Sequence, residues 1–156
     1  MVFFVVTVIF AGWRGGGPER GTAGVYVLAL TGSAYVGFLQ VPGDFQVVPI
    51  SLFLVDSLLL IALCMIAVRS NRWWPIPAAG CQLVAVLVHI GKLLDPTMIP
   101  DGYAFLVTIW SWPMVALLGL GTWAHRRRLA DSIIVPDWKP SSDARPSRSR
   151  KLQQQG

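Results

Sequence analysis

The chain has 156 residues, of which 54% are hydrophobic and only 13% are charged, and its formal net charge is +5. Soluble domains contain about 25% charged residues, so a chain this apolar lacks the polar surface that a water-soluble fold requires. The two cysteines, Cys64 and Cys81, fall inside apolar stretches, which excludes a disulfide-rich secreted scaffold. The composition therefore predicts an integral membrane protein.

The first hydrophobic segment, residues 2–13, is short for a membrane span. As a helix it rises only about 18 Å, whereas a bilayer core of about 30 Å needs about 20 residues. It has neither a basic start nor a clear small-residue cleavage site, which argues against a secretory signal peptide. Three interpretations stay open: a helix spanning a thinned bilayer, a helix in the interface, or a segment whose true start lies upstream. We favour the spanning helix.

Four further segments are long and apolar enough to span a bilayer as helices. Backbone groups cannot stay unpaired in hydrocarbon, so we expect helices rather than open strands. The sequence therefore predicts an all-α membrane protein over residues 1–130, a bundle of four full transmembrane helices plus the short N-terminal helix, with five spans favoured. The four segments are 21–40, 47–68, 78–94 and 103–125.

Loops that carry Lys or Arg alternate with loops that carry none, and positively charged loops stay in the cytoplasm. The loops near residues 42–46 and 95–102 contain no Lys or Arg. This alternation predicts an outer N-terminus and a cytoplasmic C-terminus in the bacterial cytoplasmic (inner) membrane. The basic residues that set this topology are Arg14, Arg20, Arg69, Arg72, Arg126, Arg127 and Arg128.

Aromatic side chains at the ends of the predicted helices agree with this orientation, because Trp and Tyr anchor helices at the level of the lipid headgroups. We expect Trp13, Trp73, Trp74 and Trp123 to be anchors at the cytoplasmic side, and Tyr103 at the outer side.

Polar residues inside the predicted spans need an explanation, since they are costly in hydrocarbon. Asp56 lies about 13 Å and His89 about 9 Å from the outer ends of neighbouring antiparallel helices, and Thr108 and Ser111 reach a similar depth. One hypothesis is a polar cluster of Asp56, His89, Ser111 and Thr108 that relays a proton or holds a polar ligand. The other, which we prefer from the sequence, is a structural tie between helices, worth about 0.6 kcal/mol.

The positions of the histidines and cysteines argue against a haem site and a zinc site. His89 and His125 lie near opposite ends of their helices and cannot bind the two faces of one haem. No third ligand accompanies Cys64 and Cys81 for zinc, and no nucleophile has a matched base. We therefore expect no cofactor, no metal and no enzymatic activity.

The basic segment 131–156 is predicted to be a disordered cytoplasmic tail. Residues 141–156 are rich in Ser, Arg, Pro and Gln and hold almost no apolar side chains, so we expect disorder there. No folded domain accompanies this charge, so nucleic acid is not an expected partner. The glycine-rich turn after the first segment, residues 14–20, is expected to be flexible.

The stretch Arg69–Pro75, followed by a Gln and a His on the next helix, resembles small bacterial membrane proteins of four or five helices. This resemblance implies no activity and no functional residue. We expect a small non-enzymatic membrane protein that acts through association with itself or as an accessory subunit of a larger membrane complex. The alternative is a small transporter or a proton- or ion-conducting oligomer that uses Asp56 and His89.

Overall fold

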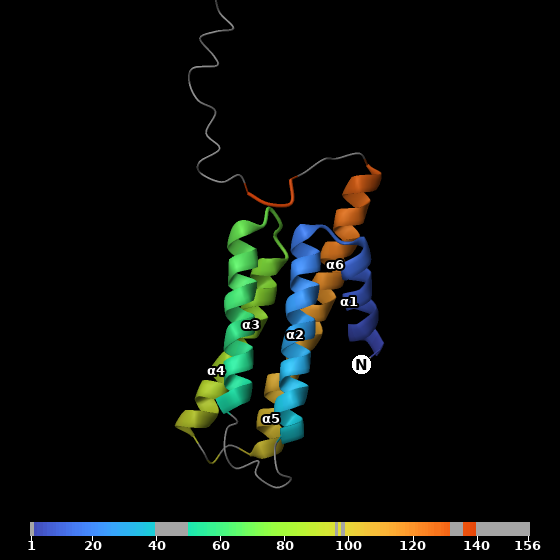
Figure 1. Cartoon of the computed structure of the whole chain (residues 1–156). Helices are drawn as coiled ribbons and strands as arrows, with labels where there is room; N and C mark the ends of the chain where they lie inside the picture. The colour runs from blue at the N-terminus through green and yellow to red at the C-terminus, as the bar shows by residue number, and fades with distance from the viewer. Residues whose placement is uncertain (1, 40–49, 96, 98, 132–135, 140–156) are drawn as a thin grey trace, which may run out of the picture.

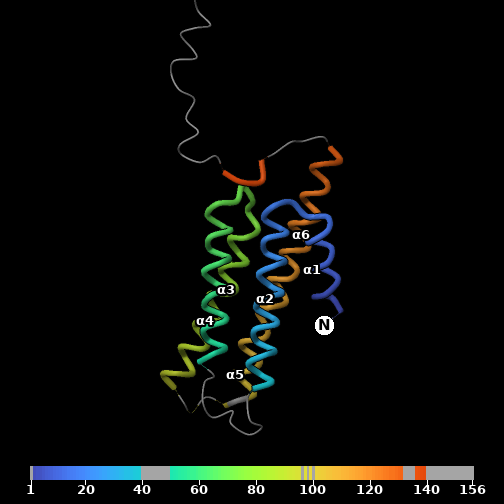
Figure 2. The backbone as a smooth tube through the Cα atoms, in the orientation of Figure 1, coloured from blue at the N-terminus to red at the C-terminus, as the bar shows by residue number. Residues whose placement is uncertain are grey.

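Figure 1 shows the computed structural model of the chain, which describes residues 2–39, 50–95, 97, 99–131 and 136–139. In Figure 1 and Figure 2 the helices run side by side along the length of an elongated bundle. The described residues form six helices: α1 (Val2–Arg14), α2 (Gly17–Leu39), α3 (Ile50–Arg69), α4 (Pro75–Leu94), α5 (Pro100–Ile109) and α6 (Ser111–Ala130).

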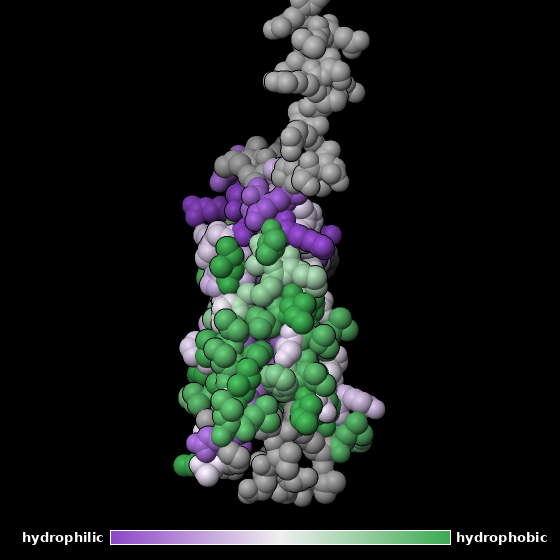
Figure 3. Space-filling view, turned by 90° about the vertical axis from the view of Figure 1, so that its left-hand side faces the viewer, coloured by the Kyte–Doolittle hydropathy of each residue, from purple (hydrophilic) through white to green (hydrophobic). Residues whose placement is uncertain are grey.

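Four helical stretches are long and apolar enough to cross a membrane: α2, α3, α4, and α5 together with α6. The predicted all-helical bundle with four such helices is thereby confirmed for the described part of the chain. Its outer surface is apolar, as Figure 3 shows over most of one face. α3 illustrates this well, because it buries only Leu59 and Leu63 although nearly all of its residues are apolar. A helix that is apolar all round, yet is not buried by protein, is typical of a membrane span.

Two helices begin earlier than the sequence predicted, and each has a proline in its first turn. α2 begins at Gly17 rather than at residue 21, and α4 begins at Pro75 rather than at residue 78. Proline is tolerated in a first helical turn because the N–H groups there have no intrahelical acceptor. The prolines predicted to lie in loops, Pro18 and Pro75, therefore lie inside helices.

The helix predicted over residues 103–125 extends from Pro100 to Ala130 in the structure. It is divided into α5 and α6 at Trp110. Pro113 explains the division, since it has no N–H to donate and its ring collides with the carbonyl four residues earlier, that of Ile109. The helical path restarts at Ser111, which places Pro113 in the first turn of α6.

α1 is a short apolar helix of 13 residues, and it packs against α2 and α6. It buries Thr7 and Ala11, and it starts partway along the bundle rather than at its end (Figure 1). α1 falls outside the group of helices with the length of a full span.

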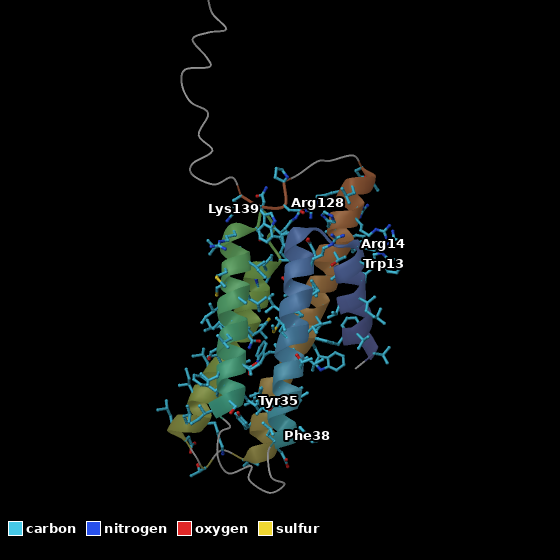
Figure 4. All side chains as sticks on the ribbon, in the orientation of Figure 1. Trp13, Arg14, Tyr35, Phe38, Arg128 and Lys139 are labelled. Carbon is cyan, nitrogen blue, oxygen red and sulfur yellow. The ribbon has the colours of Figure 1, made fainter. Side chains whose placement is uncertain are left out.

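The ends of α1, α3 and α6 and the starts of α2 and α4 lie at one end of the bundle, where Figure 3 shows a band of hydrophilic residues. Figure 4 places Arg14, Arg128 and Lys139 at this end, which we call the basic end. Tyr35 and Phe38 lie toward the other end, 66% and 87% exposed.

Part of the predicted tail is folded, contrary to expectation. The Asn71 N–H donates to the carbonyl of Asp137 at 3.0 Å, and the Lys139 N–H donates to the carbonyl of Arg69 at 2.9 Å. Residues 136–139 therefore lie across the loop between α3 and α4. The rest of the predicted tail, residues 132–135 and 140–156, lies outside the described residues, as does the loop 42–46.

Candidate functional site

Asp56 on α3 and His89 on α4 are in direct contact. The two helices are antiparallel neighbours, and Nε2 of His89 lies 2.7 Å from Oδ2 of Asp56. The His89 side chain is 1% exposed and that of Asp56 is 20% exposed. The similar depth inferred from the sequence thus corresponds to a hydrogen bond between the two side chains in the bundle interior.

Tyr103 on α5 occupies the other side of the His89 ring. Its hydroxyl lies 2.6 Å from Nδ1 of His89, and the two rings meet edge to face. A carboxylate accepts only, so Nε2 carries the hydrogen that Asp56 receives when Asp56 is ionised. In a neutral imidazole Nδ1 is then an acceptor, and the Tyr103 O–H is its donor. Both ring nitrogens of His89 are therefore satisfied by side chains from two other helices.

Gln82 completes the group from the same face of α4, seven residues before His89. Its Nε2 donates to Oδ1 and to the backbone carbonyl of Asp56, both at 3.1 Å. Gln82 is 3% exposed. We call the group formed by Asp56, Gln82, His89 and Tyr103 the His89 array. It joins α3, α4 and α5 through side chains that each find a hydrogen-bond partner inside the bundle.

The His89 array is chemically suited to accepting and releasing a proton. Histidine is the side chain that most readily changes its protonation near neutral pH. A charge in a buried site is costly unless an opposite charge lies beside it, and Asp56 supplies that charge to a protonated His89. The O–H···N and N–H···O contacts in series also give a path along which a proton can pass from one group to the next.

Two residues expected in the polar cluster do not reach His89. Oγ1 of Thr108 donates to the carbonyl of Ala104 at 2.8 Å, and Oγ of Ser111 donates to the carbonyl of Thr108 at 2.7 Å. Hydroxyl side chains often bond the backbone of their own helix in this way. Their depth along the helix axis made a contact with His89 one hypothesis, but the two hydroxyl groups are directed to backbone carbonyls instead.

A cavity of about 160 Å³ adjoins the His89 array in the middle of the bundle. Asp56 and Gln82 line it from one side, and its wall is otherwise mainly apolar. Since a water molecule takes about 30 Å³ in the liquid, the cavity has room for several. The other polar side chains in its wall are Tyr26, Ser33, Trp110 and Ser111.

The expected aromatic anchors divide into two groups. Trp13, Trp73 and Trp123 are between 55% and 75% exposed, at the basic end. Trp74 differs from the expectation, because it is 1% exposed and its indole Nε1 donates to Oε1 of Glu19 at 3.2 Å. Since an indole N–H in a buried position needs an acceptor, Glu19 holds Trp74 inside the bundle. Tyr103 likewise directs its hydroxyl to His89.

Arg72 also differs from the other topology-setting residues, which were expected to be loop charges. Its side chain is 2% exposed and forms an ion pair with Asp137, and its Nη2 lies 3.1 Å from Nδ1 of His125. Asp137 additionally accepts the N–H of Gly17 at 2.9 Å. We call Gly17, Arg72, His125 and Asp137 the tail clasp. Burial alone would raise the pKa of Asp137, but the Gly17 N–H and the Arg72 guanidinium hold it below its usual value.

The glycines that lead into α2 form the surface on which residues 136–139 pack. A Cβ atom on Gly16 would lie 2.8 Å from Oδ2 of Asp137, and one on Gly17 would lie 2.7 Å from Nε1 of Trp138. Only glycine leaves room for so close an approach. The turn that was predicted to be flexible is therefore held by the folded part of the tail.

The remaining topology-setting arginines also lie near the basic end. The guanidinium of Arg14 lies 5.9 Å from the ring centre of Trp13, and that of Arg127 lies 5.3 Å from that of Trp123. Such pairs place a cation and an amphipathic ring side by side, as is common near a headgroup layer. The other members of this group are Arg20, Arg69, Arg126 and Arg128.

No three His, Cys, Asp or Glu side chains of the described residues are grouped so that they could hold a metal ion. No family model matches the chain, and neither a curated protein nor a solved structure was found to be similar to it. The chemistry of the His89 array is therefore inferred from the contacts of its own side chains.

Proposed function

We propose that this chain is a small multi-pass protein of the bacterial cytoplasmic membrane that carries protons across it, with Asp56 and His89 as its proton-binding pair. One observation carries the proposal: His89 is buried, and each of its ring nitrogens is bonded to an ionisable side chain from another helix. Burial alone requires a partner for each ring nitrogen, but it does not require that both partners be ionisable side chains. The cavity beside Asp56 supplies the second requirement, a space with room for water next to the pair.

The membrane setting is supported by the four apolar helices of spanning length and by the exposed apolar outer surface. The basic end would face the cytoplasm, because positively charged loops are retained there. In this arrangement α1 is a fifth, short span with its N-terminus outside, and Tyr103 lies on the outer side of His89.

The proposed transfer uses the two hydrogen bonds of His89 in sequence. Tyr103 passes its hydroxyl proton to Nδ1 and takes up another proton from the outer side, which leaves an imidazolium beside Asp56. The imidazolium passes its Nε2 proton to the carboxylate of Asp56, and Asp56 releases that proton into the cavity. The ring, now protonated at Nδ1 alone, regains the starting tautomer by taking up a proton at Nε2 from water in the cavity. After it rotates away from Tyr103, it releases the Nδ1 proton to the same water. Gln82 keeps the carboxylate in place throughout, because it donates to both the side chain and the backbone of Asp56.

The test is proton flux into liposomes that contain the purified protein, a potassium gradient with valinomycin and an internal pH indicator. We expect flux with the wild-type chain and a fall to the level of empty liposomes with Asp56→Asn. Ser57→Ala is the matched control, since Ser57 bonds only the carbonyl of Phe53 on its own helix. Absence of flux in the wild type, or unchanged flux in a well-folded Asp56→Asn variant, would refute the proposal.

A second candidate, association with a further copy or with a larger membrane complex, is favoured by a groove between α2 and α3. The groove has a volume of about 310 Å³ and an apolar wall. A helix from another chain would fit such a surface without needing polar contacts. Its lining residues are Val25, Leu28, Ala29, Val55, Leu58, Leu59 and Ala62.

Gentle solubilisation followed by capture through a tag on the tail separates the two candidates. A stoichiometric partner protein would identify an accessory subunit, whereas a defined oligomer of this chain alone would agree with a proton carrier. Leu58→Trp, which fills the groove, should disrupt either assembly, and Leu83→Trp on the exposed side of α4 should not.

A further inference from the structure

Glu19, in the first turn of α2, is buried at the basic end of the bundle. It is fully buried, and its Oε1 accepts the indole N–H of Trp74. Its Oε2 is also buried but has no hydrogen-bond partner among the described residues. A carboxyl group near a helix N-terminus is favourable, but that interaction requires no burial. A buried carboxyl oxygen without a donor is costly and needs another reason.

The charged groups around Glu19 connect it to the surface of the basic end. Arg128 on α6 is close enough for its charge to interact with those of Glu19, Arg72 and Asp137. Arg72 and Asp137 belong to the tail clasp, together with His125, and the Asp137 side chain is 30% exposed. Arg128 therefore links the buried Glu19 electrostatically to the tail clasp, whose Asp137 is partly exposed to solvent.

On its other side, Glu19 begins a line of polar residues that runs along one face of α2. Thr22, Tyr26 and Ser33 follow it at helical spacing, over a rise of about 21 Å. Thr22 is fully buried and its Oγ1 has no hydrogen-bond partner among the described residues. The Tyr26 hydroxyl donates to the carbonyl of Met114 at 3.4 Å. Tyr26 and Ser33 line the cavity that also reaches Asp56.

From these contacts we infer that Glu19 is a second proton-binding residue, which exchanges protons between the central cavity and the basic end. The inference rests on the proposed proton transport and adds its route on the cytoplasmic side. A proton released by Asp56 into the cavity passes through the hydroxyls of Tyr26 and Thr22, with water between them, to the Glu19 carboxylate. Glu19 then releases it toward Arg128 and the tail clasp, and no redox partner is needed.

The experiment compares Glu19→Gln with the wild type in the same liposome assay. We expect flux to fall to the level of empty liposomes with Glu19→Gln and to be partly retained with Glu19→Asp. Thr122→Val is the matched control, because Thr122 is also fully buried but donates only to the carbonyl of Leu118 on its own helix. Its flux should equal that of the wild type.

The flux of the wild type and of the two variants separates the role of Glu19 from the proposed proton transport itself. Normal flux with Glu19→Gln, together with loss of flux with Asp56→Asn, would overturn only the role of Glu19. Absence of flux in the wild type would overturn both. If Glu19→Gln does not fold, Thr22→Val decides, since it leaves Glu19 in place and interrupts the hydroxyl route; unchanged flux would contradict the inference.

Infrared difference spectra provide a readout that does not depend on flux. A carboxyl group that binds a proton gains a C=O stretching band when the pH is lowered. We expect one component of this band to come from Glu19, so that this component is present in the wild type and in Asp56→Asn and is missing in Glu19→Gln. Identical difference spectra for the wild type and Glu19→Gln would mean that Glu19 does not exchange protons, and would overturn the inference.

Discussion

The hydroxyl of Tyr103 on α5 lies 2.6 Å from Nδ1 of His89, on the side of the ring opposite Asp56. This bond ties the short helix α5 to the pair formed by α3 and α4. It also fits the Nε2–H form of His89 that the Asp56 carboxylate imposes, because the phenol can donate only to an unprotonated Nδ1.

Replacing Tyr103 by Phe is therefore expected to remove the donor to Nδ1 while preserving the ring contact and the Nε2–H form that Asp56 imposes. Loss of one neutral hydrogen bond should lower the free energy of unfolding by about 1 kcal/mol. Nitrogen NMR of labelled His89 should show the Nε2–H form in both proteins, with the Nδ1 resonance shifted in Tyr103→Phe because Nδ1 has lost its hydrogen-bond donor. An unchanged Nδ1 resonance in the variant would mean that Tyr103 does not donate to His89.

Gln82→Met should test the support that Gln82 gives to Asp56. The variant keeps the side-chain volume but removes the donor to Oδ1 and to the carbonyl of Asp56. A polar contact between helices in a membrane contributes about 0.6 kcal/mol, so the unfolding temperature should fall slightly. Leu83→Met, on the exposed side of α4, is the control and should leave it unchanged. Equal unfolding temperatures for both variants would contradict the role of Gln82.

Gly121→Ala should strongly destabilise the bundle. A Cβ on Gly121 would lie 2.5 Å from the indole Nε1 of Trp74. The Trp74 side chain is buried and is held in place by its hydrogen bond to Glu19. Overpacking of this kind costs about 1–3 kcal/mol. Gly24→Ala is the matched control, since a Cβ there meets nothing within 4 Å and alanine favours the helix. Thermal unfolding in detergent should show a marked decrease for Gly121→Ala alone.

Acidification should open the tail clasp through Asp137. The pKa of Asp137 is lower in the folded chain than its ordinary value, so its ionised form stabilises the fold. That contribution is fully present above the ordinary pKa of a carboxyl, about 4, and is lost as the pH falls through the lower folded-state value. Limited proteolysis after Trp138, normalised to an unfolded peptide of the same sequence, should therefore be faster at low pH in the wild type.

Asp137→Asn is the variant that isolates this effect. It should be cleaved rapidly at neutral pH as well, and its cleavage should no longer depend on pH in the acidic range. Slow cleavage of Asp137→Asn at neutral pH would show that the backbone contacts of residues 136–139 hold the tail without the carboxylate.

The hydropathy of the chain was sufficient to predict its helices, its apolar outer surface and the common end of its basic loops. These properties are sums over about 20 neighbouring residues, so they do not depend on which helix lies beside which. The sequence also placed Asp56 and His89 at a similar depth, since helical rise is constant. The shared face of Gln82 and His89 likewise followed from helical periodicity.

Only the tertiary structure decided which side chains meet. Rotation of each helix about its axis is set by packing with its neighbours, and it turns Tyr103 toward His89, whereas the Ser111 hydroxyl donates to the carbonyl of Thr108. The same packing buries Glu19 against Trp74, two residues that the sequence placed in a loop and at the headgroup level. Hydropathy along the chain determined where the helices are, and contacts between residues distant in sequence determined what their polar groups can do.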